Sequence, residues 1–493
     1  MDMIEKDKEF IKKVNNRIKD KKTNVENDYY RLNYHLMPPV GFMNDPNGFI
    51  QFNGEYHLFY QFNPFFPEYK QTCWGHYKSE DLVSWTSLPI ALCPNDWYDK
   101  NGCYSGSAIN KKGEFILIYT GNVKNCKGNR ETYQCLATSK DGINFAKIPN
   151  NPVINKPEEY TEHFRDPKIW QKNNAFYTVI GAQTKEEKGC AVLFKSQNLI
   201  NWEKVGEVAT ANTEANKHLG YMWECPDLFN LNNKDVLIFS PQGVEPLGNL
   251  YNNIYQCGYF IGTLDYEKGV FDHNSFVELD RGFEFYAPQT MVDDKKRRIL
   301  IAWMGLPDEI NHPTVEKQWI HCMTIPRELF IKNNKLIQKP VEEMKKLREA
   351  LVSYENILIY NELLDFKDIV GDSIEIYLEL ENINASQFEI KLRCSEDGKE
   401  ETVIKVDFIK KEFELNREKS GLGSKGIRKC KISTHNFIKL NIFIDKSSIE
   451  IFINEGEEVF TARIYPKKDS LGVKFLSHKG KVMIKKINKW TIN

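Results

Sequence analysis

Short apolar or alternating runs, separated by turn-forming residues, follow one another along the chain from about residue 31. Runs of this kind are typical of β-strands, whose successive side chains point to opposite faces of a sheet. Only the first thirty residues differ. Apolar side chains recur there at roughly helical spacing, at Ile4, Phe10, Ile11, Val14 and Ile18. The pattern therefore predicts a helical leader over residues 1–30, packed on the surface of a β-rich body.

A repeat organises the first part of this body. Each copy begins with a small or acidic residue, continues through apolar residues and a polar turn, and ends in a strongly apolar strand. The five copies begin at Asp45, Ser105, Asp166, Glu224 and Ala287, so successive starts lie 60, 61, 58 and 63 residues apart. Repeats that hold about four strands and no helix are typical of β-propeller blades. A stacked β-solenoid is the alternative, but such solenoids use shorter repeats.

The remainder of the chain divides into two segments. The charged run KPVEEMKKLREALVSYE lies in residues 336–355 and is interpreted as a connector. Strictly alternating short runs, such as SIEIYLELE and QFEIKLRC, fill residues 356–493 and predict a β-sandwich. The expected protein is therefore all-β, with a five-bladed β-propeller over residues 31–335 followed by a C-terminal β-sandwich.

Composition narrows the classes of partner. The net charge is −1, which gives no electrostatic reason to expect nucleic acid or an anionic membrane surface. Charges run throughout the first residues and no apolar stretch is long enough to span a membrane, so neither a signal peptide nor a membrane anchor is expected. The 11 cysteines show no metal-site or disulfide spacing, which indicates reduced thiols in a cytoplasm. Nothing in the sequence indicates the oligomeric state.

Three carboxylates share one position of the repeat: Asp45, Asp166 and Glu224. Equivalent positions of successive blades surround one axis, so these side chains are expected to converge. Paired carboxylates suit glycoside hydrolysis, in which one protonates the leaving oxygen and another attacks or activates water. Like charges and burial would keep one of them protonated near neutral pH. A divalent cation is the chemical alternative. It is disfavoured because no calcium-loop pattern is present, and neither a metal nor a cofactor is predicted. The structural alternative is that Asp-Pro only starts a strand.

Seven short motifs around these positions occur in a fixed order. They are FMNDPNG (42–48), YSGS (104–107), FRDP (164–167), WECPD (223–227), FYAPQ (285–289), WMGLP (303–307) and TIPREL (324–329). In this order the chain resembles glycoside hydrolase family 32, which includes invertases, fructanases and sucrose-6-phosphate hydrolases. The run SIEIFINEGEEVFTARIYP (448–466) resembles the closing strands of that family's C-terminal domain. The family's five-bladed propeller and sandwich agree with the repeat count.

The resemblance implies a role for individual residues. Asp45 would be the nucleophile, Glu224 the general acid/base and Asp166 the stabiliser of the transition state. Substrate-binding roles are implied for Phe42, Asn44, Gln61, Trp74, Tyr104, Ser105, Arg165 and Trp303. Structural readings stay open for four of them. Trp74 and Trp303 could be core aromatics, Gln61 could satisfy a strand end, and Arg165 could be a salt-bridge partner.

Two departures from the family's pattern bear on substrate preference. Phe42 and its neighbours precede Asn44 where tryptophan is frequent, and Glu284 stands where aspartate is more usual. Cys225, which follows the proposed acid, has no neighbouring histidine in the sequence and is read as a packing neighbour rather than a nucleophile.

The activity implied is that of a retaining β-fructofuranosidase, with a carboxyl separation of about 5–5.5 Å between Asp45 and Glu224. TIPREL and WMGLPDE resemble the family's bacterial sucrose-6-phosphate hydrolase branch. This resemblance and the missing signal peptide favour sucrose 6-phosphate as substrate, with sucrose second. Lys78, Lys124 and Arg130 are candidates for binding the phosphate because they lie in loops of the first blades, and the alternative for each is a solvated surface charge. The nearest alternative is a cytoplasmic invertase or exo-fructanase. A non-catalytic fructan-binding protein and an inverting furanosidase acting on arabinan-type sugars are alternatives of other kinds.

Overall fold

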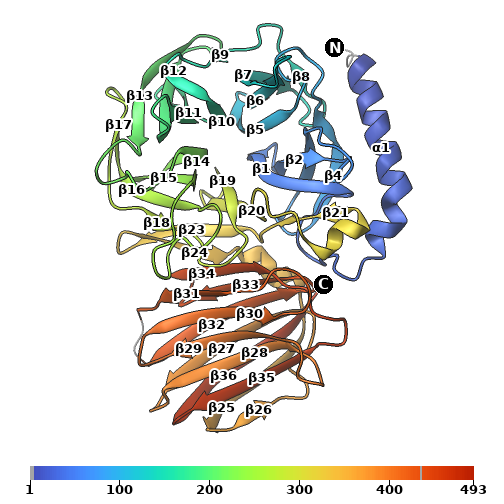
Figure 1. The fold of residues 1–493 in the computed structure, drawn as a ribbon, viewed down its shortest axis with the longest axis vertical. Helices are drawn as coiled ribbons and strands as arrows, with labels where there is room; N and C mark the ends of the chain where they lie inside the picture. Colours follow the sequence, from blue (N-terminus) through green and yellow to red (C-terminus); the bar gives the residue numbers. More distant parts are fainter. Residues whose placement is uncertain (1–4, 434–435) are drawn as a thin grey trace.

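A computed structural model describes residues 5–433 and 436–493, and this part of the chain is nearly all-β (Figure 1). The one long helix, α1 (Glu5–Glu26), lies along the outside of the first sheet. It buries Phe10 and Val14 against that sheet, and Phe10 meets the ring of Phe65 edge-on. Ile4 of the predicted helical pattern lies outside the described residues. No described helix has the length and hydropathy needed to cross a membrane.

Residues 41–340 form five sheets in chain order. The first contains β1 (Gly41–Phe52), β2 (Glu55–Asn63), β3 (Cys73–Ser79) and β4 (Trp85–Leu92). The second contains β5 (Cys103–Lys111), β6 (Glu114–Lys124), β7 (Arg130–Ser139), β8 (Ala146–Lys147) and β9 (Ile154–Asn155). The third contains β10 (Tyr160–Lys172), β11 (Ala175–Thr184), β12 (Gly189–Ser196) and β13 (Trp202–Thr210). The fourth contains β14 (Met222–Leu231), β15 (Lys234–Gln242), β16 (Gly258–Asp265), β17 (Val270–His273) and β18 (Val277–Glu278). The fifth contains β19 (Tyr286–Val292), β20 (Arg298–Met304), β22 (Cys322–Met323), β23 (Arg327–Lys332) and β24 (Lys335–Pro340).

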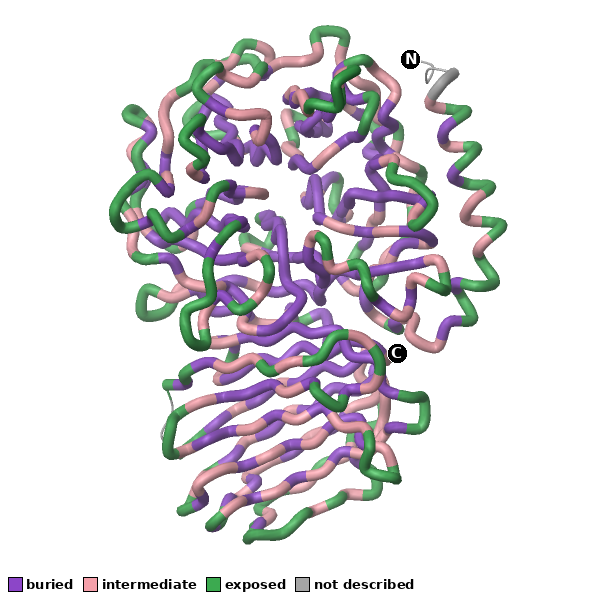
Figure 2. The backbone as a smooth tube through the Cα atoms, viewed as in Figure 1, coloured by how far each residue is buried: buried purple, intermediate pink, exposed green. Residues whose placement is uncertain are grey.

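The five sheets close into a ring around a common centre (Figure 1). The first strand of each sheet, namely β1, β5, β10, β14 and β19, contacts the first strand of the next sheet, and β19 contacts β1. A late segment also joins the first sheet, because β21 (Trp319–Ile320), which follows the short 3₁₀ helix η1 (Pro313–Lys317), pairs in parallel with β1. The first strands are largely buried, most of all β1, β14 and β19 (Figure 2). Residues at the start of each first strand therefore face one another across the ring.

Each first strand contains a β-bulge close to its start. The pairing register shifts between Met43 and Pro46, Tyr104 and Gly106, Arg165 and Lys168, Glu224 and Asp227, and Tyr286 and Gln289. A bulge leaves residues unpaired and redirects their side chains. Asp166, Cys225 and Ala287 adopt left-handed backbone conformations there, with φ of 66°, 48° and 47°. The repeat position that carries the carboxylates is thus the position of the bulge.

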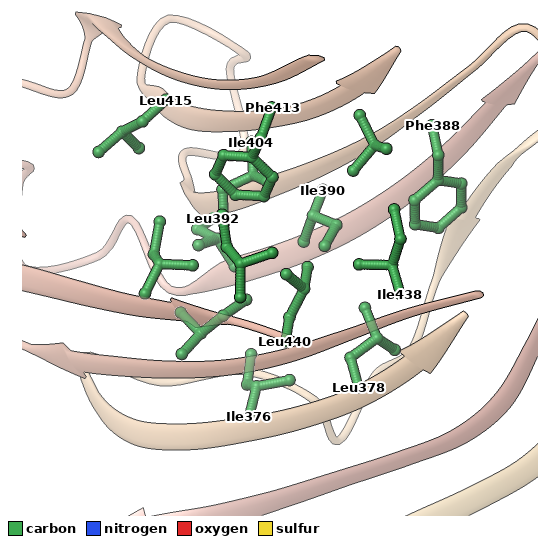
Figure 3. Close-up of a cluster of buried hydrophobic side chains, with 14 of the residues drawn as sticks. Ile376, Leu378, Phe388, Ile390, Leu392, Ile404, Phe413, Leu415, Ile438 and Leu440 are labelled. Atoms are coloured by element: carbon green, nitrogen blue, oxygen red, sulfur yellow. The ribbon is translucent and has the colours of Figure 1, made fainter. Parts of the chain in front are cut away.

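The second unit is made of two six-stranded sheets. The first sheet runs in the order β25 (Arg348–Tyr360), β36 (Lys481–Ile492), β27 (Ser373–Asn382), β32 (Phe437–Asp445), β33 (Ser448–Ile453) and β34 (Glu458–Arg463). The second runs in the order β26 (Leu363–Asp365), β35 (Gly472–His478), β28 (Gln387–Cys394), β29 (Glu401–Asp407), β30 (Glu412–Lys419) and β31 (Ile427–Lys431). Alternate side chains of both sheets meet in one aliphatic core, where Ile376 and Leu440 of one sheet face Ile390 and Leu415 of the other (Figure 3).

The join between the two units is shorter than the connector expected over residues 336–355. Strand β24 continues to Pro340, the 3₁₀ helix η2 (Glu342–Leu347) follows, and β25 begins at Arg348. The sequence hides the start of β25 because a bulge between Glu349 and Val352 interrupts the alternation of side chains. Ala350 lies in this bulge with a left-handed φ of 46°.

Buried ion pairs connect the second unit to the ring and its N-terminal approach. The imidazole of His35 lies between two carboxylates of the second unit, with Nδ1 2.8 Å from Asp445 and Nε2 3.0 Å from Glu450. The same Glu450 accepts a hydrogen bond of 2.5 Å from Arg327 of β23. These side chains are fully buried, so both units and the segment before β1 share one network of charges.

Candidate active site

A cavity of about 450 Å³ opens where the first strands of the five sheets begin. Nine of the residues predicted for the site line it: Phe42, Asn44, Asp45, Gln61, Tyr104, Arg165, Asp166, Glu224 and Trp303. They come from β1, β2, β5, β10, β14 and β20, that is, from five different sheets. The ring therefore brings together residues that are up to 261 positions apart in the sequence.

The three carboxylates are joined through two shared neighbours. The backbone N–H of Cys225 donates to Asp166 over 3.1 Å, and the thiol of Cys225 lies 3.6 Å from Asp45 Oδ2. Arg165 binds Glu224 and also lies 3.8 Å from Asp166 Oδ2. The aligned repeat positions thus form one electrostatically coupled group.

Asp45 is held by three side-chain donors. Ser105 Oγ donates to its Oδ2 over 2.5 Å, Gln61 Nε2 donates to the same oxygen over 2.9 Å, and Asn44 Nδ2 donates to Oδ1 over 3.2 Å. Burial raises the pKa of Asp45, and the hydrogen bonds from Ser105 and Asn44 offset part of that rise. The donors fix the orientation of the carboxylate and favour its charged form, which is the form that a nucleophile requires.

Asp166 retains a proton more readily than an ordinary aspartate. Burial, and then the negative charges of Glu224 and Asp45, raise the pKa of Asp166 to about 7, although Arg165 opposes the shift. Its strained backbone is held in place because its N–H donates to Thr120 Oγ1 over 2.9 Å. Near neutral pH this carboxyl can therefore both donate and accept hydrogen bonds.

Glu224 is surrounded by donors on both oxygens. Arg165 donates to Oε1 through Nε at 3.0 Å and through Nη2. Gln242 Nε2 and the hydroxyl of Tyr286 donate to Oε2 over 2.8 and 2.7 Å. Burial alone would raise the pKa of Glu224, but the charge and hydrogen bonds of Arg165 outweigh it and lower the pKa. The proton expected on the acid is thus favoured on Asp166 rather than on Glu224.

Two predicted binding residues lie behind the cavity wall. Trp74 is fully buried in an aromatic cluster, where its indole Nε1 donates to the backbone carbonyl of Tyr104 over 3.1 Å. It does not line the cavity, because β3 is set back from the ring's centre. Ser105 is also buried and uses its hydroxyl to hold Asp45. Both residues support groups that line the cavity.

The remaining candidates from the sequence differ in whether they line the cavity. Trp303 lines the cavity beside the rings of Phe42 and Tyr286. Glu284 lies outside the cavity and binds Arg417 of the second unit, so the fifth sheet contributes Tyr286 in place of a carboxylate. Among the three phosphate candidates, Arg130 lines the cavity. Lys78 pairs with Glu55 at 2.6 Å. Lys124 is exposed, and neither lysine lines the cavity.

Gln242, Tyr286 and His163 also line the cavity, although the sequence motifs assigned them no role. A signal for Gln242 exists in the repeat. Glutamines lie at or near the end of the second strand of three copies, at Gln61, Gln183 and Gln242, and follow the acidic residue of their copy by 16, 17 and 18 positions. Gln61 and Gln242 both donate to that acidic residue, whereas Gln183 donates to the backbone of Tyr221 over 3.0 Å.

The geometry provides a buried, hydrogen-bonded carboxylate at Asp45, an arginine-bound carboxylate at Glu224 and, at Asp166, a carboxyl whose pKa is raised to about 7. Such a set can exchange a proton with a leaving oxygen while a second carboxylate attacks carbon. Within residues 5–433 and 436–493, no group of three or more His, Cys, Asp or Glu side chains has a geometry that could hold a metal ion.

Two family models match the chain. The model described as the glycosyl hydrolases family 32 N-terminal domain matches residues 35–340, and the model described as the family 32 C terminal matches residues 343–491. The matches meet at the join between the ring and the second unit.

Similar proteins point to the same family. A sucrose-6-phosphate hydrolase of Bacillus subtilis (strain 168) is 45% identical, over 94% of this chain and 95% of that protein. A sucrose-6-phosphate hydrolase of Klebsiella pneumoniae is 40% identical, over 89% of both. The solved structure of sucrose-6-phosphate hydrolase from Lactobacillus gasseri superposes with a TM-score of 0.89 at 32% identity, covering 97% of this chain and 96% of that one. A Bombyx mori family 32 β-fructofuranosidase variant in complex with sucrose superposes with a TM-score of 0.86 at 33% identity, covering 100% and 99%.

Proposed function

Since the chain belongs to glycosyl hydrolase family 32, we propose that it is a retaining β-fructofuranosidase that hydrolyses sucrose 6-phosphate. It is a glycoside hydrolase that acts on fructosides. The observation that carries the proposed mechanism is the linked group of Asp45, Asp166 and Glu224 at the mouth of one cavity. Solved relatives with a bound fructoside, such as the Bombyx mori complex with sucrose, support a small sugar as the ligand.

The fold proposed for this activity is a five-bladed β-propeller followed by a β-sandwich. Each of the five sheets would be one blade, with its first strand nearest the axis and the bulge at the cavity. The proposed boundary lies between residues 340 and 343, where the two family matches meet. The helix α1 would be a leader that packs on the first blade.

In the proposed first step, Asp45 attacks the anomeric carbon of the terminal fructofuranosyl unit. Glu224 transfers a proton to the glycosidic oxygen as that bond breaks, so the leaving sugar departs neutral at this oxygen. Ser105, Gln61 and Asn44 keep Asp45 oriented and ionised for the attack. The product of the step is a fructosyl ester of Asp45.

In the proposed second step, water hydrolyses this ester. Glu224, now ionised, takes a proton from the water, and the oxygen attacks the same anomeric carbon from the face that the leaving group vacated. Fructose therefore leaves with retained configuration. The hydrogen bonds from Arg165, Gln242 and Tyr286 suit this step, because they stabilise the ionised form of Glu224.

The remaining cavity residues are proposed to bind the fructosyl unit. Asp166 can share hydrogen bonds with sugar hydroxyls because its pKa of about 7 allows both protonation states near neutral pH. The rings of Phe42 and Trp303 offer apolar faces in the same cavity. Trp74 and Ser105 are proposed to position Tyr104 and Asp45 rather than to touch the sugar.

The substrate proposal follows from the relatives. Sucrose-6-phosphate hydrolases match this chain over most of its length, and sucrose is proposed as a second substrate. A phosphorylated disaccharide carries charge that keeps it from crossing membranes. The proposed location of the enzyme is therefore the cytoplasm.

The test compares kcat/KM for sucrose 6-phosphate with kcat/KM for sucrose in the purified protein. We expect a higher value for sucrose 6-phosphate. An equal or higher value for sucrose would replace the proposal by an invertase or an exo-fructanase with the same catalytic residues. Binding of fructosides without hydrolysis of either sugar would contradict the enzymatic function.

A further inference from the structure

Arg130 is the first residue of β7 and lines the cavity, but its guanidinium has no hydrogen-bond partner among the residues that the structure describes. Every other arginine of the chain donates at least one side-chain hydrogen bond within residues 5–433 and 436–493, and most of them bind carboxylates. The one ring contact of Arg130 is with Tyr104, whose centroid lies 5.7 Å from the guanidinium carbon. A cationic fork with all of its donors free inside a cavity is suited to an anionic ligand.

The position of Arg130 relates it to the leaving group. Arg130 begins β7, and β7 contacts β10, the strand that carries His163 and the Glu224-binding Arg165. Its positive charge contributes to lowering the pKa values of Glu224 and His163, which agrees with a place on this side of the cavity. Glu224 is the proposed proton donor to the glycosidic oxygen. The sugar that departs with that oxygen must therefore lie beside Glu224, within reach of this side of the cavity.

His163 adds a neutral donor on the same side. Arg165 Nη1 donates to His163 Nδ1 over 3.0 Å, so the ring must be neutral and carry its proton on Nε2. Burial and the charges of Arg165 and Arg130 lower the pKa of His163 to about 4, which agrees with a neutral ring. Lys70, from the loop between β2 and β3, also lines the cavity, and no salt bridge engages it in the described part of the chain.

We propose that Arg130 binds the phosphate group of the leaving sugar, with the Nε2–H of His163 and the ammonium of Lys70 as further donors. This inference rests on the proposed function. Two parallel N–H donors of a guanidinium match two phosphate oxygens, and hydrogen bonds between charged partners are the strongest in proteins. Plain sucrose offers no such partner. Arg130 is therefore a specificity-determining residue that favours the phosphorylated disaccharide.

The experiment measures kcat/KM for sucrose 6-phosphate and for sucrose in the wild type and in Arg130→Gln, Arg130→Lys and Lys124→Gln. Lys124 is the matched control because it is the cation that pairs with Arg130 across β6 and β7, but it is exposed and does not line the cavity. For Arg130→Gln, we expect the ratio of the two constants to fall roughly 10- to 100-fold, the usual worth of hydrogen bonds to charged groups. For Arg130→Lys the ratio should fall less, since lysine keeps the positive charge but lacks the forked donors of the guanidinium. Lys124→Gln should leave the ratio unchanged.

Inorganic phosphate is the second probe. It should inhibit hydrolysis of sucrose by the wild type competitively, and Arg130→Gln should weaken this inhibition. The inference is overturned if Arg130→Gln lowers both constants equally, or if it leaves both the ratio and the phosphate inhibition unchanged. A wild type that hydrolyses both sugars, together with either of these results for Arg130→Gln, would overturn only this inference. A wild type that hydrolyses neither sugar would overturn the proposed function and the inference with it.

Discussion

The guanidinium of Arg165 binds Glu224 Oε1 through two nitrogens, with Nε at 3.0 Å. The arrangement favours the ionised carboxylate of Glu224, which the second step of the proposed mechanism uses as a base. The first step needs the opposite state, with a proton on Glu224. Asp166, whose pKa is about 7, is the group in the same cluster that holds a proton near neutral pH. The pH dependence of the enzyme should therefore reflect one proton shared within the carboxylate group.

The shared proton leads to a first prediction. The proton is lost as the pH rises through the region of the Asp166 pKa, about 7, after which no carboxyl of the group can act as an acid. We expect kcat/KM to fall on the alkaline side with an apparent pKa near that value. The measurement is kcat/KM from pH 4 to 10 at constant ionic strength. A rate that stays constant up to pH 10 would show that no such proton is required.

A second prediction concerns Arg165→Gln. Removing the cation takes away the charge that lowers the pKa values of Glu224 and Asp166, so both pKa values should rise. The alkaline limb of kcat/KM should then move to higher pH, while kcat/KM itself falls because Glu224 loses the donor that orients it. Arg348→Gln is the control, since Arg348 pairs with Glu375 in the second unit. An alkaline limb that stays in place or moves to lower pH would contradict the role given to Arg165.

Ser105→Ala tests the support of the proposed nucleophile. The hydroxyl donates to Asp45 and lowers its pKa, so its removal should raise that pKa and move the acidic limb of kcat/KM to higher pH. We expect kcat at the optimum to fall roughly tenfold, as for the loss of one charge-assisted hydrogen bond. Ser139 ends β7 in the same sheet and does not line the cavity, so Ser139→Ala should leave the pH profile unchanged. An unmoved acidic limb in Ser105→Ala would exclude this role.

His35 makes stability depend on pH. Burial alone would lower the pKa of His35, but its hydrogen bonds to Asp445 and Glu450 outweigh burial and raise the pKa to about 9. Because the folded pKa exceeds the unfolded value of about 6.5, the stabilisation is complete below that value and is lost as the pH rises through about 9.

His35→Gln should therefore lower the unfolding midpoint near pH 6, with a loss of about 3–5 kcal/mol typical of breaking a buried ion pair. In the wild type, loss of the His35 proton lowers the stability to unfolding between pH 7 and 10. The variant should lack this part of the decrease in stability. Parallel curves for the two proteins over this range would contradict a charged His35. Denaturant unfolding followed by tryptophan fluorescence provides the measurement.

The repeat made the arrangement of the site predictable, because equal spacing placed Asp45, Asp166 and Glu224 at one position of consecutive units. The pattern could not show the bulges that redirect these residues, since a bulge changes register without changing residue type. Trp74 illustrates a similar limit, because an aromatic residue beside a cavity and one behind its wall have the same sequence signal.

The proton distribution could not be predicted either. It depends on the distance from Arg165 to Glu224, which joins two sheets. Likewise, Lys78, Lys124 and Arg130 are equivalent cations in the sequence. Their surroundings distinguish them. Lys78 pairs with Glu55, whereas Arg130 lines the cavity with no hydrogen-bond or salt-bridge partner among the described residues.

The covalent intermediate on Asp45 tests the proposed mechanism most directly. Glu224→Gln should lower hydrolysis of sucrose 6-phosphate by about 10²–10⁴-fold, because it removes the proton donor and the base. A donor such as a fructofuranosyl fluoride needs no proton to release its leaving group, so Asp45 can still attack it. Without a base at position 224 the resulting ester should accumulate. Acid quenching, proteolysis and mass spectrometry of the variant then locate it. We predict one dehydrated fructose on the peptide that carries Asp45, and none when Asp45→Asn is added. A fructosyl group on another residue, or fructose released with inverted configuration and no adduct, would contradict the double displacement through Asp45.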